Sequence, residues 1–170
     1  ARVITAWYRW EKRSAGRRPR VLDVEGGSGA CVAAAEEGGR RARSRVGGGS
    51  GGGRKTSGGM AEVDQRVADA GGSALGMRNA IAFLAGEKSG TRLETVVLAF
   101  AAEMLVQSGV ASSREDGEAQ AAEALSSGKA ADIFGRMAHM LGGPSDLMEK
   151  PDSYLPAAPA IRPVVATRSG

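Results

Sequence analysis

The side chains best suited to catalysis are few in this chain and lie far apart in sequence. The single histidine, His139, is flanked by Met137, Met140 and Leu141. Without a carboxylate or cysteine companion, such a histidine is more typical of a partly buried helix residue than of a catalyst. The single cysteine, Cys31, lies in no recognisable nucleophile signature and cannot form an internal disulfide, which is typical of a reducing compartment. Neither residue predicts nucleophilic or acid–base catalysis.

A glycine-rich turn, Gly26-Gly27-Ser28-Gly29, follows the strand-like run Val21–Val24 and could present backbone amides to a phosphate. It lacks the Lys-Ser/Thr ending of a P-loop and the Gly-x-Gly-x-x-Gly spacing of a dinucleotide fold. A plain strand-to-helix turn is therefore favoured. The adjacent carboxylates Glu36-Glu37 and Glu115-Asp116 fall on segments expected to be exposed, where they are typical of a solvated surface.

Caps and apolar spacing predict the helices that must position any site. The first has Ser73 as its cap, carries Met77, Ile81 and Leu84 on one face, and ends at Gly86. The second is expected to be buried on most of its sides, because its apolar residues form a wide stripe. It opens with the capping-box spacing Thr91-x-x-Glu94, runs to Gln107, and has its stripe at Val97, Phe100, Ala101, Met104 and Leu105.

Two further helices follow. Ser113 with Asp116 starts a third, which runs to about Ser126. The fourth covers Lys129–Leu141 and is stopped by Gly142-Gly143-Pro144. Its residues expected to point inward are Ile133, Phe134, Met137 and Leu141. After Pro151 the chain is expected to be extended, with Ile161–Thr167 as a possible strand.

Composition divides the chain at about residue 60. Residues 1–59 carry a net charge of +8 and residues 60–170 a net charge of −4, and 13 of the 26 glycines fall between Gly26 and Gly59. We therefore predict a basic Gly/Arg-rich segment over 1–60 with one short strand (21–24), and a helical part over 61–170. Composition alone predicts disorder after that strand, including a flexible linker over Gly47–Gly53.

The basic segment raises the question of an anionic partner. Its opening, Trp7-Tyr8-Arg9-Trp10, interleaves rings and cations as single-strand binders do. No second stacking platform appears elsewhere, so rings that cover a neighbouring sheet are favoured over nucleic-acid binding. No secretory signal or apolar run of about 20 residues is visible. We expect a cytoplasmic protein that does not enter a membrane.

Several motifs together resemble the thymidine and pyrimidine-nucleoside phosphorylases. The resemblance is good from Asp64 to Gly170 and poor over residues 1–60. The segments that carry the resemblance are Gly72-Ser73-Ala74-Leu75, Asn79-Ala80-Ile81, Ala102-Glu103-Met104-Leu105-Val106, Ser127-Gly128-Lys129-Ala130-Ala131-Asp132-Ile133-Phe134-Gly135-Arg136-Met137, Tyr154-Leu155-Pro156-Ala157-Ala158 and Arg168-Ser169-Gly170. It implies an α/β fold, here mostly helical with few strands, and an enzyme that splits a pyrimidine nucleoside with phosphate into base and pentose 1-phosphate.

The resemblance also implies where substrate binds. The family holds phosphate with a Lys-His-Ser-Thr-Gly-Gly segment, which these 170 residues do not contain. It holds the base partly with a Ser-x-x-x-Lys pair before a strand resembling Val21-Leu22-Asp23-Val24. Counting back without gaps, Trp7 stands at the Ser position and Glu11 at the Lys position. A carboxylate cannot donate to a pyrimidine carbonyl and an indole would crowd the base, so the base site is expected to be altered.

A cation site and a partner follow from the same resemblance. Some members bind a potassium-like ion through two carbonyls after an Asp-Gln pair and a Glu on the next helix. From Asp64-Gln65, the matching positions are Val67, Ala70 and Asn79. Asn79 offers a neutral oxygen, so the ion is expected to bind weakly.

The resemblance also implies a homodimer, since members of the family work as dimers. We expect little activity from the isolated chain, and the alternative is a non-catalytic helical interaction module over Ser73–Leu141.

Overall fold

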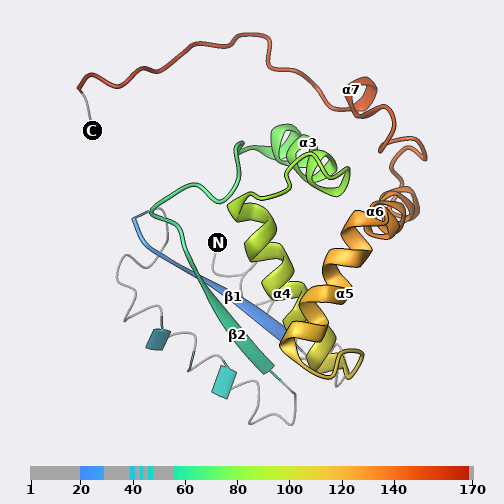
Figure 1. The fold of residues 1–170 in the computed structure, drawn as a ribbon. Coiled ribbons are helices and arrows are strands. Elements are labelled where there is room, and N and C mark those ends of the chain that lie inside the picture. The colour runs from blue at the N-terminus through green and yellow to red at the C-terminus, as the bar shows by residue number, and fades with distance from the viewer. Residues whose placement is uncertain (1–19, 29–38, 41–42, 44–45, 48–55, 169–170) are drawn as a thin grey trace, which may run out of the picture.

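The computed structural model describes residues 20–28, 39–40, 43, 46–47 and 56–168 (Figure 1). The elements whose bounds fall within these described residues are two strands and, after them, five helices. The elements are β1 (Arg20–Gly26), β2 (Thr56–Glu62), α3 (Ser73–Leu84), α4 (Arg92–Ser108), α5 (Arg114–Ser126), α6 (Lys129–Met140) and α7 (Pro151–Tyr154). The expected fold class, α/β with mostly helical residues and few strands, is confirmed.

The two described strands form a parallel pair. The register runs from Arg20 opposite Thr56 to Gly26 opposite Glu62. The strand predicted over 21–24 is confirmed and is longer than expected. The expectation of disorder is wrong for Thr56–Gly59, which lies in β2. Two adjacent glycines hid the strand pattern, and pairing with β1 supplies the stability that their missing side chains do not.

Helix α4 covers one face of the sheet and separates it from α5 (Figure 1). The crossing of α4 and α5 is close because Ala102 is fully buried opposite a glycine. A Cβ built on Gly117 would lie 2.9 Å from the carbonyl oxygen of Ala102. Backbone therefore packs on backbone at this crossing, and α6 packs against α5 in turn.

The helix starts follow their predicted caps in two of three cases. Thr91 Oγ1 accepts from the Glu94 amide at 3.4 Å, and Glu94 accepts from the Gly90 amide at 2.6 Å, one residue before the expected partner. Ser113 Oγ accepts from the Asp116 amide at 3.2 Å. The cap predicted at Ser73 is wrong: Gly72 holds that position, without a side-chain cap, and Ser73 is the first helical residue.

Several apolar residues predicted to face inward are instead exposed. On α6, Ile133 is 59% exposed and Met137 49%, and Leu141 at its end is 81% exposed. On α4, Val97 is 37% and Met104 53% exposed, but the other three residues of the predicted stripe are partly buried, so burial is incomplete along one line of the helix only. Within the described residues, α6 packs against α5 and α3 and leaves the face with Ile133 and Met137 uncovered, whereas α4 lies between the sheet and α5. Amphipathic spacing identifies an apolar face but does not supply what covers it.

The predicted strand over Ile161–Thr167 is wrong. Residues 155–168 contain no helix or strand, and Ile161 and Val164 are 87% and 98% exposed. A strand needs a neighbour to accept and donate its backbone hydrogen bonds, and Pro163 has no N–H to donate. Among the described residues, no helix is long and apolar enough to cross a membrane.

Candidate functional site

The carboxyl ends of β1 and β2 meet at one edge of the sheet. Parallel pairing places Gly26 beside Glu62, and the Val63 amide donates to the Gly26 carbonyl at 2.9 Å. In open α/β sheets, ligands bind at the edge where the carboxyl ends of the strands lie. This edge is therefore the first place to look for a site.

Asp64 fixes the turn that follows β1. Gly27 has a φ of 127°, a conformation that favours glycine, and a Cβ there would lie 2.9 Å from the Asp64 amide nitrogen. The Ser28 amide donates to Asp64 Oδ1 at 2.6 Å. This bond from the Ser28 amide holds the pKa of Asp64 below its usual value. The Ser28 side chain and the Arg92 charge lower the pKa further. Because the Ser28 amide is already used, the geometry favours a structural turn over a phosphate loop.

Arg92 joins the start of α4 to the same edge. Its Nη2 atom lies 2.8 Å from Glu62 Oε2 and also donates to the Glu62 carbonyl. The other oxygen of Glu62 accepts from the Asp64 amide. The network of Ser28, Glu62, Asp64 and Arg92 thus ties both strand ends and α4 together. The sequence alone did not predict this network. The only local signal for it is Asp64, a carboxylate two residues after the end of β2.

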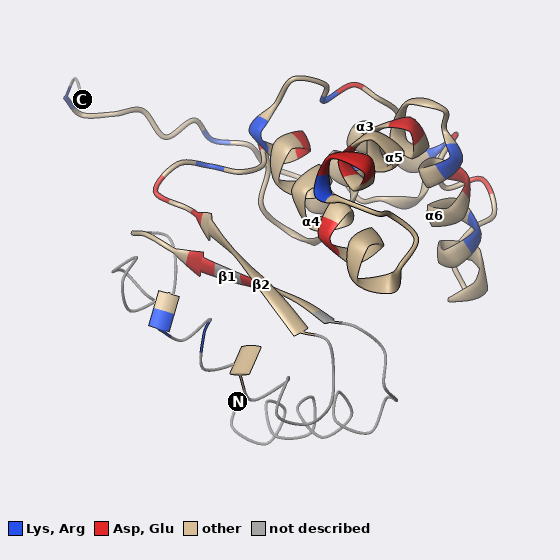
Figure 2. Ribbon diagram, turned by 60° about the horizontal axis from the view of Figure 1, so that its bottom comes forward, with Lys and Arg blue, Asp and Glu red and all other residues tan. Residues whose placement is uncertain are grey.

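Acidic residues also occur on β1 itself, where the ribbon is red (Figure 2). Asp23 and Glu25 are two residues apart and therefore on the same face of the strand. Partial burial, with the nearby Glu25 charge, raises the pKa of Asp23. The two carboxylates therefore give this face of the strand a negative charge.

The Tyr-Leu-Pro motif is held against α3. Arg78 donates to the Leu155 carbonyl at 2.5 Å and pairs with Asp152. The Tyr154 hydroxyl donates to Asp146 Oδ1 at 2.6 Å, and this bond raises the pKa of Tyr154. The motif is therefore an anchor for the segment after α7, and no acid–base role follows from its geometry.

The predicted site residues are placed only in part. Trp7, Glu11 and Cys31 lie outside the described residues. His139 is in α6 as expected, but it is exposed and its Nδ1 lies 3.2 Å from the Gly143 carbonyl. No group of three or more His, Cys, Asp or Glu side chains that could hold a metal occurs in the described part of the chain.

The positions matched to the potassium site are half-buried. Val67 and Ala70 lie between β2 and α3, and Asn79 lies on α3. Their oxygens are all neutral, and the neighbouring Asp69 is paired with Lys88 at 2.7 Å. These three positions therefore offer a cation only neutral oxygens, and the potassium site stays a prediction.

The amino-acid sequence of this chain is similar to those of known thymidine phosphorylases. A thymidine phosphorylase of Sinorhizobium medicae is 46% identical over 168 residues, which is 99% of this chain and 38% of that protein. Those of Agrobacterium fabrum and Rhizobium meliloti are 49% and 45% identical over the same 168 residues, with the same coverage. The chain is homologous to a segment of the thymidine phosphorylases.

The thymidine phosphorylase match extends further than the motifs alone indicated. Its 168 residues take in the basic N-terminal segment as well as the helical part. The chain spans little more than a third of the length of these relatives, 38%. No protein-family model matches the chain.

Proposed function

We propose that this chain supplies the interior sheet-and-helix part of a pyrimidine-nucleoside phosphorylase. In that reaction a phosphate oxygen bonds to the sugar carbon as the N-glycosidic bond breaks, and the base leaves with the bond's electron pair and a proton. The products are the free base and a pentose 1-phosphate. The observation that carries the proposal is identity of 45–49% over 168 residues to proteins named thymidine phosphorylase.

The geometry of the strand ends supports this role. Catalysis of this kind depends on holding phosphate, sugar and base in fixed positions while charge develops on the sugar. At the carboxyl edge of the sheet, hydrogen bonds and an ion pair of Asp64, Glu62 and Arg92 join both strand ends to α4. These contacts fix the backbone from which such positioning would be made. These residues act on the turn and the strand ends, and we assign them no contact with substrate.

Within this proposal, the 170-residue chain alone has little or no phosphorolytic activity. It contains no Lys-His-Ser-Thr-Gly-Gly segment to hold phosphate. Trp7 and Glu11 stand where the family has Ser and Lys. The purified chain, incubated with thymidine and phosphate, is expected to release no thymine above the uncatalysed background, and phosphate-dependent release would contradict this part of the proposal.

The function itself is tested by a graft. Residues 61–168 of this chain replace the homologous residues of the Sinorhizobium medicae protein, and phosphorolysis of thymidine is measured for the parent and the chimera. The graft leaves the N-terminal segment of the parent in place. We expect the chimera to retain activity within about tenfold of the parent. A folded chimera without activity would overturn the proposal.

An interaction module is the second candidate, and one observation favours it. Ile133, Met137 and Met140 lie on one face of α6, and each of these residues is between 49% and 85% exposed. Exposed apolar faces of this kind are typical of surfaces covered by a partner. Light scattering on the purified chain tests this candidate: a stable dimer or larger assembly supports it, and a monodisperse monomer counts against it.

A further inference from the structure

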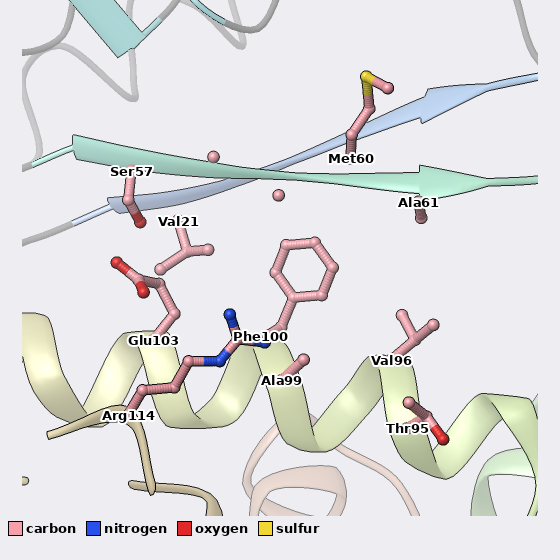
Figure 3. Close-up of a pocket in the computed structure, with 12 residues that line it drawn as sticks. Val21, Ser57, Met60, Ala61, Thr95, Val96, Ala99, Phe100, Glu103 and Arg114 are labelled. Carbon is pink, nitrogen blue, oxygen red and sulfur yellow. The ribbon is translucent and has the colours of Figure 1, made fainter. Parts of the chain in front are cut away.

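A cavity of about 380 Å³ lies between α4 and the sheet, apart from the carboxyl edge described above (Figure 3). Its walls come from both strands, from α4 and from the start of α5. The volume lies within the range of about 300–1,000 Å³ that small-molecule sites occupy. The side chains at one end are polar and charged, whereas those at the other end are mostly apolar, so a ligand that fits the cavity has two unlike ends.

Phe100 gives the cavity an aromatic wall between these two ends (Figure 3). Its ring lies so close to β2 that a Cβ built on Gly59 would be 2.8 Å from Cζ. Glycine inside a strand commonly marks such a close approach. The face of an aromatic ring carries partial negative charge, so it attracts a cation within about 6 Å of the ring centre and also packs against apolar groups.

A carboxylate stands at the polar end. The Glu103 side chain and the Ser57 hydroxyl point into the space between α4 and β2 (Figure 3). Gln107 bridges them, with its Nε2 atom donating to Ser57 and lying 3.1 Å from Glu103 Oε1. Hydrogen bonds from Ser57 and Gln107, with a smaller effect of the Arg114 charge, lower the pKa of Glu103, so the group is ionised at neutral pH. Both hydrogen-bond partners are neutral and do not cancel its charge.

The cation that lines the cavity, Arg114, is paired with another carboxylate. Its Nε atom lies 3.2 Å from Glu118 Oε1, and within the described residues Glu103 itself forms no ion pair. Two carboxylates and one guanidinium thus leave this end of the cavity with one net negative charge. Gln107 Oε1 is also buried without a hydrogen-bond partner in the described part of the chain, which adds to the excess of acceptors around Glu103.

We propose that this cavity binds a small primary amine, an ammonium group on a short apolar body. The ammonium donates to Glu103 beside the face of the Phe100 ring, and the apolar body extends along the ring toward Met60 and Val96. An anion would be repelled by Glu103, and a neutral polar group would form a weaker hydrogen bond with it. The site does not depend on the proposed phosphorolysis, since it uses none of the positions matched to the family's base, phosphate or potassium contacts.

Benzylamine, which is protonated at neutral pH, is the probe. Benzyl alcohol and phenylacetate are its matched controls, because they keep the ring and carry a neutral and a negative group in place of the ammonium. Binding of each to the full chain is measured by saturation-transfer NMR, without nucleoside or phosphate. We expect benzylamine to bind with a Kd of about 1 mM or below. Both controls are expected to bind at least about tenfold more weakly.

Three variants test the assignment of the charge. Glu103→Gln removes the charge and keeps the length of the side chain, and circular dichroism checks its folding. Glu123→Gln removes the same charge from an exposed position of α5 that does not line the cavity, where it pairs with Lys129. We expect Glu103→Gln to weaken benzylamine binding by at least about tenfold and Glu123→Gln to leave it within about twofold. Arg114→Gln is expected not to weaken binding, because it removes a positive charge close to the ammonium.

The proposal is overturned if benzylamine does not bind at concentrations up to about 10 mM, or if either control binds as tightly. Normal binding by a folded Glu103→Gln, or weaker binding by Arg114→Gln, also overturns it. Equal losses in Glu123→Gln and Glu103→Gln would show a general attraction of cations to the chain and would overturn it as well. If Glu103→Gln does not fold, the three probes on the unmodified chain decide the proposal. None of these outcomes decides the graft experiment, which measures turnover.

Discussion

The crossing of α4 and α5 makes a sharp prediction about two glycines. Gly117 of α5 faces the backbone of Ala102, and a Cβ there would lie 2.9 Å from the carbonyl oxygen and 3.0 Å from Cα. Backbone atoms cannot rotate away as a flexible side chain can. Gly117→Ala therefore forces the two helices apart, at a cost of about 1–3 kcal/mol for overpacking.

Gly76 of α3 is the matched control. It also lies inside a helix, but a Cβ there meets nothing within 4 Å. Replacing glycine by alanine inside a helix gains about 1 kcal/mol from propensity at either position. We therefore expect Gly76→Ala to stabilise the chain by up to about 1 kcal/mol and Gly117→Ala to be less stable than Gly76→Ala by about 1–3 kcal/mol.

Urea unfolding followed by circular dichroism at the helix band measures both free energies. The difference between the two variants isolates the close contact, because the propensity gain is common to them. Unchanged slopes with urea would show that the unfolded state is not responsible. Equal stabilisation of both variants would refute the close crossing and, with it, the packing of α5 on α4.

Three further predictions concern the helix cap and the strand edge. Thr91→Ala removes the cap of α4 and is expected to lower the free energy of unfolding by about 1 kcal/mol, whereas Thr91→Ser keeps the oxygen and costs much less; equal losses in urea unfolding would contradict the cap. The lowered pKa of Asp64 means that its stabilisation is present above its unfolded-state pKa and is lost as pH falls through the folded one. Asp64→Asn is therefore expected to weaken the fall in stability on acidification, and an unchanged acid profile would show that this carboxylate does not anchor the turn. Arg92→Met breaks the ion pair with Glu62 and, as both side chains are partly exposed, is expected to cost at most about 1 kcal/mol. Faster hydrogen exchange at the Val63 and Asp64 amides is the expected local sign, and unchanged exchange there would argue against the network.

Local signals predicted the helices of this chain well. The caps at Thr91 and Ser113 depend on atoms within four residues of each other, so the sequence contains all that is needed to recognise them. The strand β1 was also visible as a short apolar run. β2 was not, because Gly58 and Gly59 carry no side chains to form an alternating pattern. Its existence depends on β1 and on Phe100, which lies 41 residues later than Gly59 in the sequence.

Longer-range features could not be predicted from the sequence. The contacts among Glu62, Asp64 and Arg92 join residues up to 30 apart, and their types alone do not pair them. Exposure of Ile133 and Met137 likewise depends on which elements lie nearby. The apolar run after Ile161 has strand-like residues, but a strand forms only beside a partner. In each case the residue types agree with the expected local structure, and the outcome depends on a neighbouring element that lies far away in the sequence.

The central claim, that this chain forms part of a phosphorylase site altered at Trp7 and Glu11, is tested most directly by reverting those positions. All 168 homologous residues are placed in the Sinorhizobium medicae thymidine phosphorylase, with and without Trp7→Ser and Glu11→Lys, and kcat/KM for thymidine is compared. We expect the unreverted chimera to be inactive and the double reversion to restore at least about a hundredfold, since two polar contacts to the base are regained. Full activity without reversion, or no recovery in a folded reverted chimera, would contradict the claim.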